Sequence, residues 1–592
     1  MACIRALAAA SLLCALGAGH GDDDHCTHEA SMVNYTCNTT TCGGYMAYKA
    51  SACTASMKCP AVVVIQDWNG MNDYEKERTR MLAEMGYVGF AADIYGYGTP
   101  VEDMSDWMAA SSAHRGNPDL YMSKISAAID KVKSLDFVDT TKVAVIGYCF
   151  GGTGVVNMAI LGMEGVLGVV GYHSGISPNA RVVRGNSTAP MVAKVLLHSG
   201  VKDDAATDMA MLEEEFESAG ATYEIVRYGS GVYHSFTEWT ASVPMQSMYD
   251  QRADVRSWES TKHFLMELFD GLPAASRGPE NDMLTTGLHN YTCNTTTCEG
   301  YMAYNASGCT ASMKCPAVVV IQDWNGMNDY EKERSRMLAE MGYVGFAADI
   351  YGYGTPVEDM SDWMAASSAH RGNPDLYMSK ISAAIDKVKS LDFVDTTKVA
   401  VIGYCFGGTG VVNMAILGME GVLGVVGYHS GISPNARVVR GNSTTPMVAK
   451  VLLHSGVKDD AATDMAMLEE EFESAGATYE IARYGSGIYH SFTEWTASVP
   501  MQAMYDQRAD VRSWESTKHF LMELFVGLPA AEREPECHLD VGLRFPGPCQ
   551  TLIPGDHDHD HDHDNQVEGS ETSSGMAAFL SSALGAVLAL LA

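Results

Sequence analysis

The chain has 592 residues, of which 46% are hydrophobic and 19% charged, with a formal net charge of −34 and a pI of about 4.8. A chain of this length forms several domains, and its apolar fraction is sufficient for ordinary globular cores. So acidic a chain argues against nucleic-acid binding, which needs a basic surface, and we expect no nucleic-acid partner.

The N-terminal residues 1–19 have the layout of a secretory signal peptide. Arg5 gives a positive start, an apolar stretch follows, and small residues precede the acidic and His-containing segment 20–33, which we interpret as a linker. The alternative is a buried helix. Seven Asn-x-Ser/Thr sequons agree with a secretory route. They begin at Asn34, Asn38, Asn186, Asn290, Asn294, Asn305 and Asn442.

An internal repeat dominates the chain. Residues 34–273 recur as 290–529, an offset of 256, with nine differences over 240 positions. Each copy has the size of a complete domain, and the segment 274–289 is predicted to be a linker between them. Because the copies are nearly identical, agreement between them says little about which residues matter.

Each copy opens with four cysteines. In a secreted chain this predicts two disulfides per copy, although three pairings remain open. Zinc binding is the alternative, but the spacing lacks paired C-x-x-C knuckles. Cys149 and Cys405 lie far from these clusters and are predicted to be free thiols. The clusters are Cys37, Cys42, Cys53 and Cys59, and Cys293, Cys298, Cys309 and Cys315.

Apolar runs and amphipathic segments alternate within each copy. Such alternation predicts an α/β fold with a mostly parallel sheet and helices on both faces. In the first copy the predicted strands are 61–66, 87–93, 142–148, 166–172, 194–200 and 223–229. The predicted helices are 75–86, 121–135, 206–220 and 256–269.

The strand at 142–148 leads directly into Cys149, and a glycine-rich segment after it begins a helix. Gly147 and Gly151 leave room for a sharp turn, which places the sulfur near a helix N-terminus and favours the thiolate. The backbone amide of Phe150 then points at a developing oxyanion. The alternative is a buried cysteine in a packing turn. We predict a nucleophile at Cys149, and in the second copy at Cys405.

A thiol nucleophile needs a base, and the base needs an orienting carboxylate. Asp203 and His234 each follow a later strand, so both are expected at the same rim of the sheet as Cys149. His173 is the competing base. Asp204 is the competing carboxylate, for which we expect the role of a solvated loop charge. The corresponding residues of the second copy are Cys405, Asp459 and His490.

Several motifs resemble the dienelactone hydrolase family over nearly all of each copy: "VVVIQDWNG", "GYCFGG", "HSGVKDD", "YHSF" and "YDQRADVRSWESTKHF". The resemblance implies two tandem α/β-hydrolase-type domains that cleave small ester or lactone substrates. It assigns Cys149 as nucleophile, His234 as base and Asp203 as orienting residue. It also implies an oxyanion hole from the amides of Trp68 and Phe150, with no cofactor and no metal. The second copy offers Trp324 and Phe406.

Two departures from the family pattern concern charge. Asp67 stands where members carry a glutamate beside the thiol; we weigh an accessory carboxylate against a loop carboxylate that caps backbone amides. Members also hold a substrate carboxylate with two arginines, whereas Tyr97 and Glu238 occupy these regions. The reversed charge argues against an acidic dienelactone as substrate. The second copy has Asp323 and Glu494 at the two acidic positions.

The C-terminal part differs from the repeats. Residues 530–564 form a Cys-containing, His-Asp-rich tail, in which Cys537 and Cys549 could pair. The tract 557–564 is interpreted as a spacer, with weak divalent metal binding compatible with it. Residues 565–592 match a glycolipid-anchor signal, the alternative being a true membrane span.

We therefore expect a surface-anchored hydrolase. A non-catalytic binding protein on a hydrolase scaffold, with a metal-binding His-Asp stalk, is the alternative from a different class. If the protein is an enzyme, the alternative to a lactonase is a thioesterase or general esterase.

Overall fold

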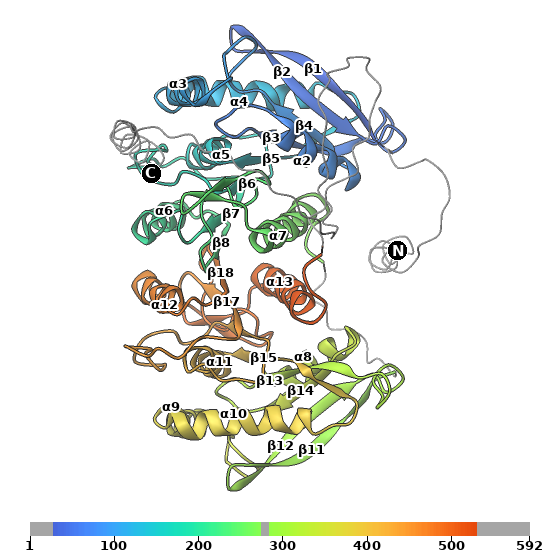
Figure 1. Cartoon of the computed structure of the whole chain (residues 1–592), viewed down its shortest axis with the longest axis vertical. Coiled ribbons are helices and arrows are strands. Elements are labelled where there is room, and N and C mark those ends of the chain that lie inside the picture. The colour runs from blue at the N-terminus through green and yellow to red at the C-terminus, as the bar shows by residue number, and fades with distance from the viewer. Residues whose placement is uncertain (1–27, 274–282, 530–592) are drawn as a thin grey trace, which may run out of the picture.

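The computed structural model describes residues 28–273 and 283–529 (Figure 1). The predicted signal peptide, His-Asp-rich tail and anchor signal lie outside the described residues. Within the described ranges, no helix combines the length and the apolar character needed to cross a membrane.

Each copy is built on an eight-stranded sheet with the order β1-β2-β4-β3-β5-β6-β7-β8 in the first copy. The six strands from β4 to β8 in this order run parallel to one another, whereas the outer hairpin of β1 and β2 is antiparallel and β2 pairs antiparallel with β4. The strands are β1 (Glu29–Cys37), β2 (Thr40–Tyr48), β3 (Cys59–Ile65), β4 (Val88–Ala92), β5 (Val138–Tyr148), β6 (Gly168–Tyr172), β7 (Lys194–Gly200) and β8 (Tyr223–Tyr228), with a small ribbon of β9 (Ser242–Val243) and β10 (Ser247–Met248).

Helices cover both faces of this sheet. α4 (Pro118–Lys133), α5 (Phe150–Ile160) and α6 (Ala206–Ser218) pack on one face, and α2 (Asp73–Glu84) and α7 (Gln251–Asp270) pack on the other. α3 (Met104–Arg115) lies beside α4. The central strands are buried on both sides, which is why they read as continuous apolar runs. The predicted α/β fold with a mostly parallel sheet is confirmed.

The second copy repeats this arrangement. Its strands are β11 (Thr285–Cys293), β12 (Thr296–Tyr304), β13 (Cys315–Ile321), β14 (Val344–Ala348), β15 (Val394–Tyr404), β16 (Gly424–Tyr428), β17 (Lys450–Gly456), β18 (Tyr479–Tyr484), β19 (Ser498–Val499) and β20 (Ala503–Met504). Its helices are α8 (Asp329–Glu340), α9 (Met360–Arg371), α10 (Pro374–Lys389), α11 (Phe406–Ile416), α12 (Ala462–Ser474) and α13 (Gln507–Phe525).

The cysteine clusters pair locally. Cys37 bonds Cys42 across the turn of the β1–β2 hairpin, and Cys53 bonds Cys59. The second copy has the equivalent bridges, Cys293–Cys298 and Cys309–Cys315. The prediction of two disulfides per copy and of free thiols at Cys149 and Cys405 is confirmed.

The hairpins also correct the predicted linkers. Residues 29–33 belong to β1 and residues 285–289 to β11, although both were expected in linkers. These strands lie at the sheet edge with most side chains half-buried or exposed, so they carry no continuous apolar run for the sequence to reveal.

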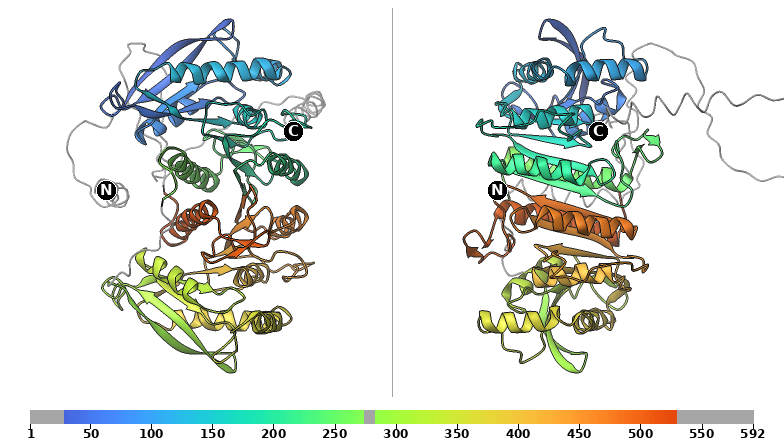
Figure 2. Two further views of the ribbon diagram at one scale, coloured as in Figure 1. Left: turned by 180° about the vertical axis from the view of Figure 1, so that it is seen from behind. Right: turned by 90° about the vertical axis from the view of Figure 1, so that its left-hand side faces the viewer.

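The two copies are not separate bodies. β8 pairs antiparallel with β18, so the sheets fuse into one of 16 strands. Figures 1 and 2 show α7 beside α13, and α6 beside α12, across this seam. A side chain at Gly229 is excluded, because a Cβ there would lie 1.9 Å from the ring of Tyr479. The repeat was recognisable from sequence, but this junction was not.

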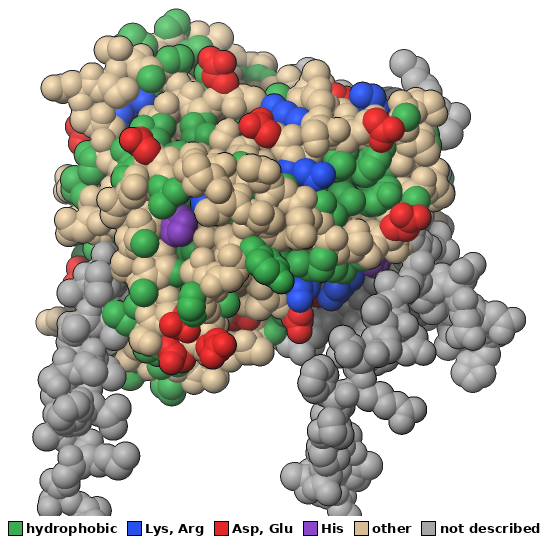
Figure 3. Space-filling model, turned by 90° about the horizontal axis from the view of Figure 1, so that it is seen from above, with side chains coloured by type: hydrophobic (Ala, Val, Ile, Leu, Met, Phe, Trp, Pro, Cys, Tyr) green, Lys and Arg blue, Asp and Glu red, His purple; other side chains and the backbone are tan. Residues whose placement is uncertain are grey.

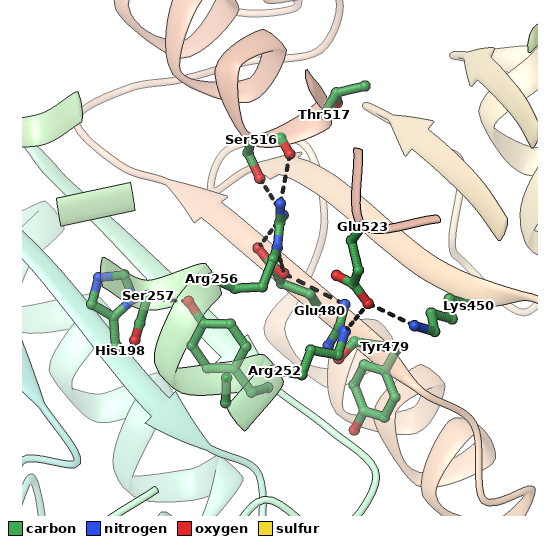
Figure 4. A network of polar contacts seen from close by, with 12 residues as sticks. His198, Arg252, Arg256, Ser257, Lys450, Tyr479, Glu480, Ser516, Thr517 and Glu523 are labelled. Atoms are coloured by element: carbon green, nitrogen blue, oxygen red, sulfur yellow. Dashed lines mark hydrogen bonds and ion pairs between the residues drawn. The ribbon is translucent and has the colours of Figure 1, made fainter. Parts of the chain in front are cut away.

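Buried ion pairs cross the seam. Arg256 Nε donates to Glu480 at 2.9 Å, and its other nitrogens donate to Ser516 (Figure 4). Arg252 Nε similarly donates to Glu523 at 2.9 Å. Each pair recurs in the reverse direction, for example from Arg512 to Glu224 at 2.8 Å. The junction therefore contains buried ion pairs. In each of two equivalent sets, one repeat supplies the arginine and the other repeat supplies the glutamate.

The end of the molecule formed by the first copy has a mixed surface. Acidic and basic side chains are interspersed over this face, and hydrophobic side chains form small patches between them (Figure 3). No broad basic patch stands out on it, which agrees with the net charge of −34.

Candidate active site

Cys149 lies in a sharp turn between β5 and α5. Its backbone has φ 49° and ψ −106°, a region that residues other than glycine rarely adopt. The turn depends on its glycines: a Cβ on Gly147 would lie 2.1 Å from the carbonyl oxygen of Gly151, and one on Gly151 would lie 2.4 Å from that of Ile65. The strained geometry is that of a nucleophile elbow, and Cys405 adopts it as well, with φ 50°.

Asp203 and His234 come together beside this turn. Asp203 follows β7, His234 follows β8, and Nδ1 of His234 lies 2.7 Å from Oδ1 of Asp203. Burial lowers the pKa of His234, but Asp203 and Cys149 outweigh it and hold that pKa well above its usual range. Burial and Asp67 raise the pKa of the Cys149 thiol and His234 lowers it, so the imidazole lies near the sulfur; among the described residues its Nε2 atom is buried and has no hydrogen-bond partner. The second copy joins His490 to Asp459 at 2.8 Å.

The competing residues have other partners. Nε2 of His173 lies 2.9 Å from the hydroxyl of Thr237, and burial holds the pKa of His173 well below its usual range. Asp204 accepts a hydrogen bond of 2.7 Å from Ser199, and burial together with Asp203 raises its pKa to about 8. The expectation of a solvated loop charge at Asp204 was wrong, because the turn after β7 folds its side chain inward.

Asp67 lies near the thiol, at the start of the loop between β3 and α2. Its side chain is 3% exposed, and it accepts a hydrogen bond from the backbone amide of Trp68. Burial raises the pKa of the Cys149 thiol, and Asp67 raises it further. The same carboxylate therefore caps a backbone amide and lies beside the sulfur. Asp323 and Trp324 repeat the contact in the second copy.

The amides considered for the oxyanion hole belong to residues adjacent in sequence to Cys149 and Asp67. Phe150 is the first residue of α5, and Trp68 follows Asp67. In this structure the Trp68 amide is already engaged by Asp67, so it becomes available to a substrate only when that contact breaks. Phe406 begins α11 in the same way.

The sequence interpretation missed one charged residue near the site, Arg115, and considered Tyr97, which is largely exposed. Arg115, the last residue of α3, is close enough to lower the pKa of both Asp67 and Cys149. Tyr97 is 81% exposed and does not take the place of the family's arginine. An arginine ending the helix after "DIYGYG" was visible in the sequence, but only the fold brings it to the cysteine.

Two glutamates complete the electrostatics. Glu75, at the start of α2, accepts hydrogen bonds from the amides of Asp67 at 3.1 Å and Asn72 at 2.9 Å, and burial raises its pKa to about 8. Burial, and the nearby Asp67, raise the pKa of Glu238 to about 7. The site therefore gathers several carboxyl groups, with Arg115 near Asp67 and Cys149 and Arg78 near Glu238.

The parallel sheet, the helices on both faces and the cysteine elbow at the carboxyl end of β5 define an α/β-hydrolase-type protein. The family model described as "Dienelactone hydrolase family" matches residues 43–269 and again 300–525. The chain belongs to the dienelactone hydrolase family, with one complete match in each repeat, and it is a hydrolase of the ester and lactone class. The resemblance predicted from sequence is confirmed.

Individual relatives cover one repeat at a time. Carboxymethylenebutenolidase 1 of Cupriavidus pinatubonensis is 27% identical over 203 residues, which is 33% of this chain and 81% of that protein. An uncharacterised protein of Caenorhabditis elegans is 27% identical over 154 residues, 25% of this chain and 92% of that protein. A solved structure, the dienelactone hydrolase-like promiscuous phosphotriesterase P91 from metagenomic libraries, is 29% identical with a TM-score of 0.37 and covers 41% of this chain and 99% of that one.

Proposed function

We propose that each repeat hydrolyses ester, lactone or thioester bonds through a cysteine nucleophile, a histidine base and an orienting aspartate. The observation that carries the proposal is the His234–Asp203 hydrogen bond of 2.7 Å beside the elbow at Cys149. The second repeat supplies Cys405, Asp459 and His490 in the same relationship.

The chemistry follows from these contacts. His234 takes the thiol proton, and the sulfur of Cys149 attacks the carbonyl carbon. The developing oxyanion accepts hydrogen bonds from the amides of Phe150 and Trp68. The carbonyl then re-forms, and the alcohol or thiol leaves with the proton from His234. A water, deprotonated by His234, cleaves the acyl-cysteine and returns the free thiol.

Asp67 links substrate binding to activation of the thiol. At rest it accepts from the Trp68 amide and raises the pKa of Cys149, which favours the protonated and unreactive sulfur. A substrate carbonyl oxygen that takes over the Trp68 amide displaces this carboxylate. The same movement completes the oxyanion hole and removes the interaction that raised the pKa of the sulfur.

The charges favour a substrate that is neutral near the scissile bond. Glu238 and Asp67 disfavour a carboxylate, while Arg115 compensates only part of their charge. The Trp68 ring packs edge-on against Trp107, with ring centroids 5.7 Å apart, and supplies aromatic surface next to the nucleophile. Neutral esters and lactones are therefore expected to react faster than acidic dienelactones.

We also place the protein in the secretory pathway and at the cell surface. Two disulfides in each repeat are typical of an oxidising compartment. Six sequon asparagines are exposed, and only Asn305 is half-buried. The signal peptide, the spacer tract with its weak metal affinity and the glycolipid anchor complete this proposal. Release of the expressed protein from cells by a phosphatidylinositol-specific phospholipase tests the anchor.

A substrate panel tests the activity. The full chain is assayed with aryl esters, thioesters and lactones beside Cys149→Ala, Cys405→Ala and the double variant. Each single variant is expected to keep roughly half the activity, because each repeat holds its own site, and the double variant none above background. Mass spectrometry should detect an acyl adduct on Cys149 or Cys405. Full activity in the double variant contradicts the proposal, and absence of activity in the wild type favours the binding-protein alternative.

A further inference from the structure

A second cluster of ionisable side chains lies far along the sheet from either cysteine, where α7 and α13 meet. Glu259 and His263 are four residues apart on α7, so both lie on the same helix face. Glu515 and His519 have the same spacing on α13. The two helices pack side by side (Figures 1 and 2), and Nε2 of His263 lies 3.0 Å from Nε2 of His519.

The glutamates approach this pair of rings crosswise. Oε2 of Glu259 lies 3.8 Å from Nε2 of His519, and Oε2 of Glu515 lies 3.9 Å from Nε2 of His263. The other oxygen of each glutamate pairs with a lysine on its own helix at 2.6 Å. One carboxylate oxygen from each helix therefore remains directed at the histidine of the opposite repeat.

The cluster borders a small cavity and is open to ions. Its four side chains line that cavity together with Arg256, Ser260, Arg512 and Ser516. The two histidine and two glutamate side chains of the cluster are between 19% and 22% exposed, so an ion can reach them from solvent. The charges of the two arginines are met by Glu480 and Glu224, which leaves the carboxylates of the cluster to act on a cation.

The two rings face each other through their Nε2 atoms, which lie 3.0 Å apart, so the nitrogens that would bind a metal converge on one point. A direct hydrogen bond between the rings requires one to donate and the other to accept, although their surroundings are equivalent. A metal ion between the rings would receive a lone pair from both Nε2 atoms, so the two rings could have the same role.

The distances suit a tetrahedral site. With zinc–nitrogen bonds of about 2.0–2.1 Å, neighbouring ligand atoms lie about 3.3 Å apart. The observed separations of 3.0 Å between the nitrogens and 3.8–3.9 Å to the carboxylates lie on either side of this value. Among the described residues, Glu259, His263 and His519 form the one group with metal-ligand spacing.

We propose that one zinc ion binds between His263, His519, Glu259 and Glu515 and joins the two repeats. Glu259, His263 and His519 have the spacing of metal ligands, and Glu515, 3.9 Å from His263, would supply the fourth protein ligand that is typical of a structural zinc. Its ligands come equally from both copies, so it forms only when the repeats are docked. Neither cysteine site takes part.

Zinc titration of the full chain tests this proposal. The His-Asp tract is first silenced by replacing His557, His559, His561 and His563 with Gln, because it offers competing ligands. In this background calorimetry is expected to find one zinc per chain, and zinc to raise the melting temperature. Cobalt(II) in place of zinc should give the visible absorption of a tetrahedral site. Absence of tract-independent binding overturns the proposal.

Variants then locate the ion. His263→Asn with His519→Asn is expected to abolish the zinc equivalent, while His289→Asn, on β11, keeps it. Glu259→Gln with Glu515→Gln preserves the shape of the interface and is expected to weaken zinc at least about tenfold. If the histidine pair fails to fold, the glutamine pair decides. Unchanged affinity in the glutamine pair, or an unchanged equivalent in the folded asparagine pair, overturns the proposal.

Discussion

Nδ1 of His234 lies 2.7 Å from Oδ1 of Asp203, whereas the adjacent Asp204 accepts a hydrogen bond from Ser199 instead. Two consecutive carboxyl groups in one turn thus have different partners. Asp203 fixes the imidazole, while Asp204, with its pKa raised to about 8, is mostly protonated at neutral pH. Because the two carboxyl groups differ in this way, substitution of Asp203 can be compared with the same substitution of Asp204 as its control.

The first prediction uses that pair in a Cys405→Ala background, where only the first site works. Asp203→Asn is expected to lower kcat by about 10²–10⁴, because the imidazole loses the group that holds its tautomer and stabilises its charge. Asp204→Asn should leave kcat nearly unchanged, since an amide resembles the protonated carboxyl. Ester hydrolysis measures both. Equal losses in the two variants contradict the assignment of Asp203.

The second prediction concerns the resting thiol. Asp67 raises the pKa of Cys149, so Asp67→Asn in the same background should lower that pKa. A decrease of one unit raises the thiolate fraction about tenfold below the pKa. Alkylation by iodoacetamide at pH 7 is expected to become faster, with its pH profile displaced to lower pH. If Asp67 also controls when the thiol becomes reactive, the kcat of the Asp67→Asn variant for ester hydrolysis should fall. An unchanged alkylation profile shows that Asp67 does not control the sulfur.

The third prediction is a pH dependence of substrate selection. The pKa of Glu238 is raised to about 7, so this carboxyl is neutral below pH 7 and charged above it. For an ester with an anionic acyl group, KM should increase as the pH rises through 7, whereas a neutral ester should show little change. Glu238→Gln removes the charge and should flatten the profile. An equal slope for the two esters in the wild type argues against Glu238 as a specificity determinant.

The fourth prediction concerns the seam between the repeats. Arg256 and Glu480 are 3% and 4% exposed and form an ion pair across it. Arg256→Ala leaves that carboxylate without its main partner in a buried setting, where such losses cost about 3–5 kcal/mol of unfolding free energy. Lys76→Ala removes a pair with Asp73, which is 96% exposed, and should cost below about 1 kcal/mol. Denaturant unfolding compares them, and equal midpoints exclude a stabilising role for the seam pair.

Much of the fold could be predicted because it depends on local patterns. The sequence shows the apolar runs of β3, β5 and β7, because strands buried on both faces are apolar along their length. It also shows the helical spacing of α2 and α4, because a helix buried on one side carries an apolar stripe. β1 and α3 were missed because most of their side chains are half-buried or exposed and carry no such pattern. β2 was missed although it is largely buried, because its residues TTCGGYMAY form no apolar run.

The sequence by itself determined the repeat, the alternation of strands and helices, the cysteine elbow and the loops that carry Asp203 and His234. Only the tertiary structure decided which adjacent aspartate meets the imidazole, that Arg115 and Glu238 join the site, and that His263 faces His519 across the seam. These relationships depend on side-chain direction and on contacts between segments up to 256 residues apart. A one-dimensional pattern records which side of an element is apolar, but not which distant polar group packs against it.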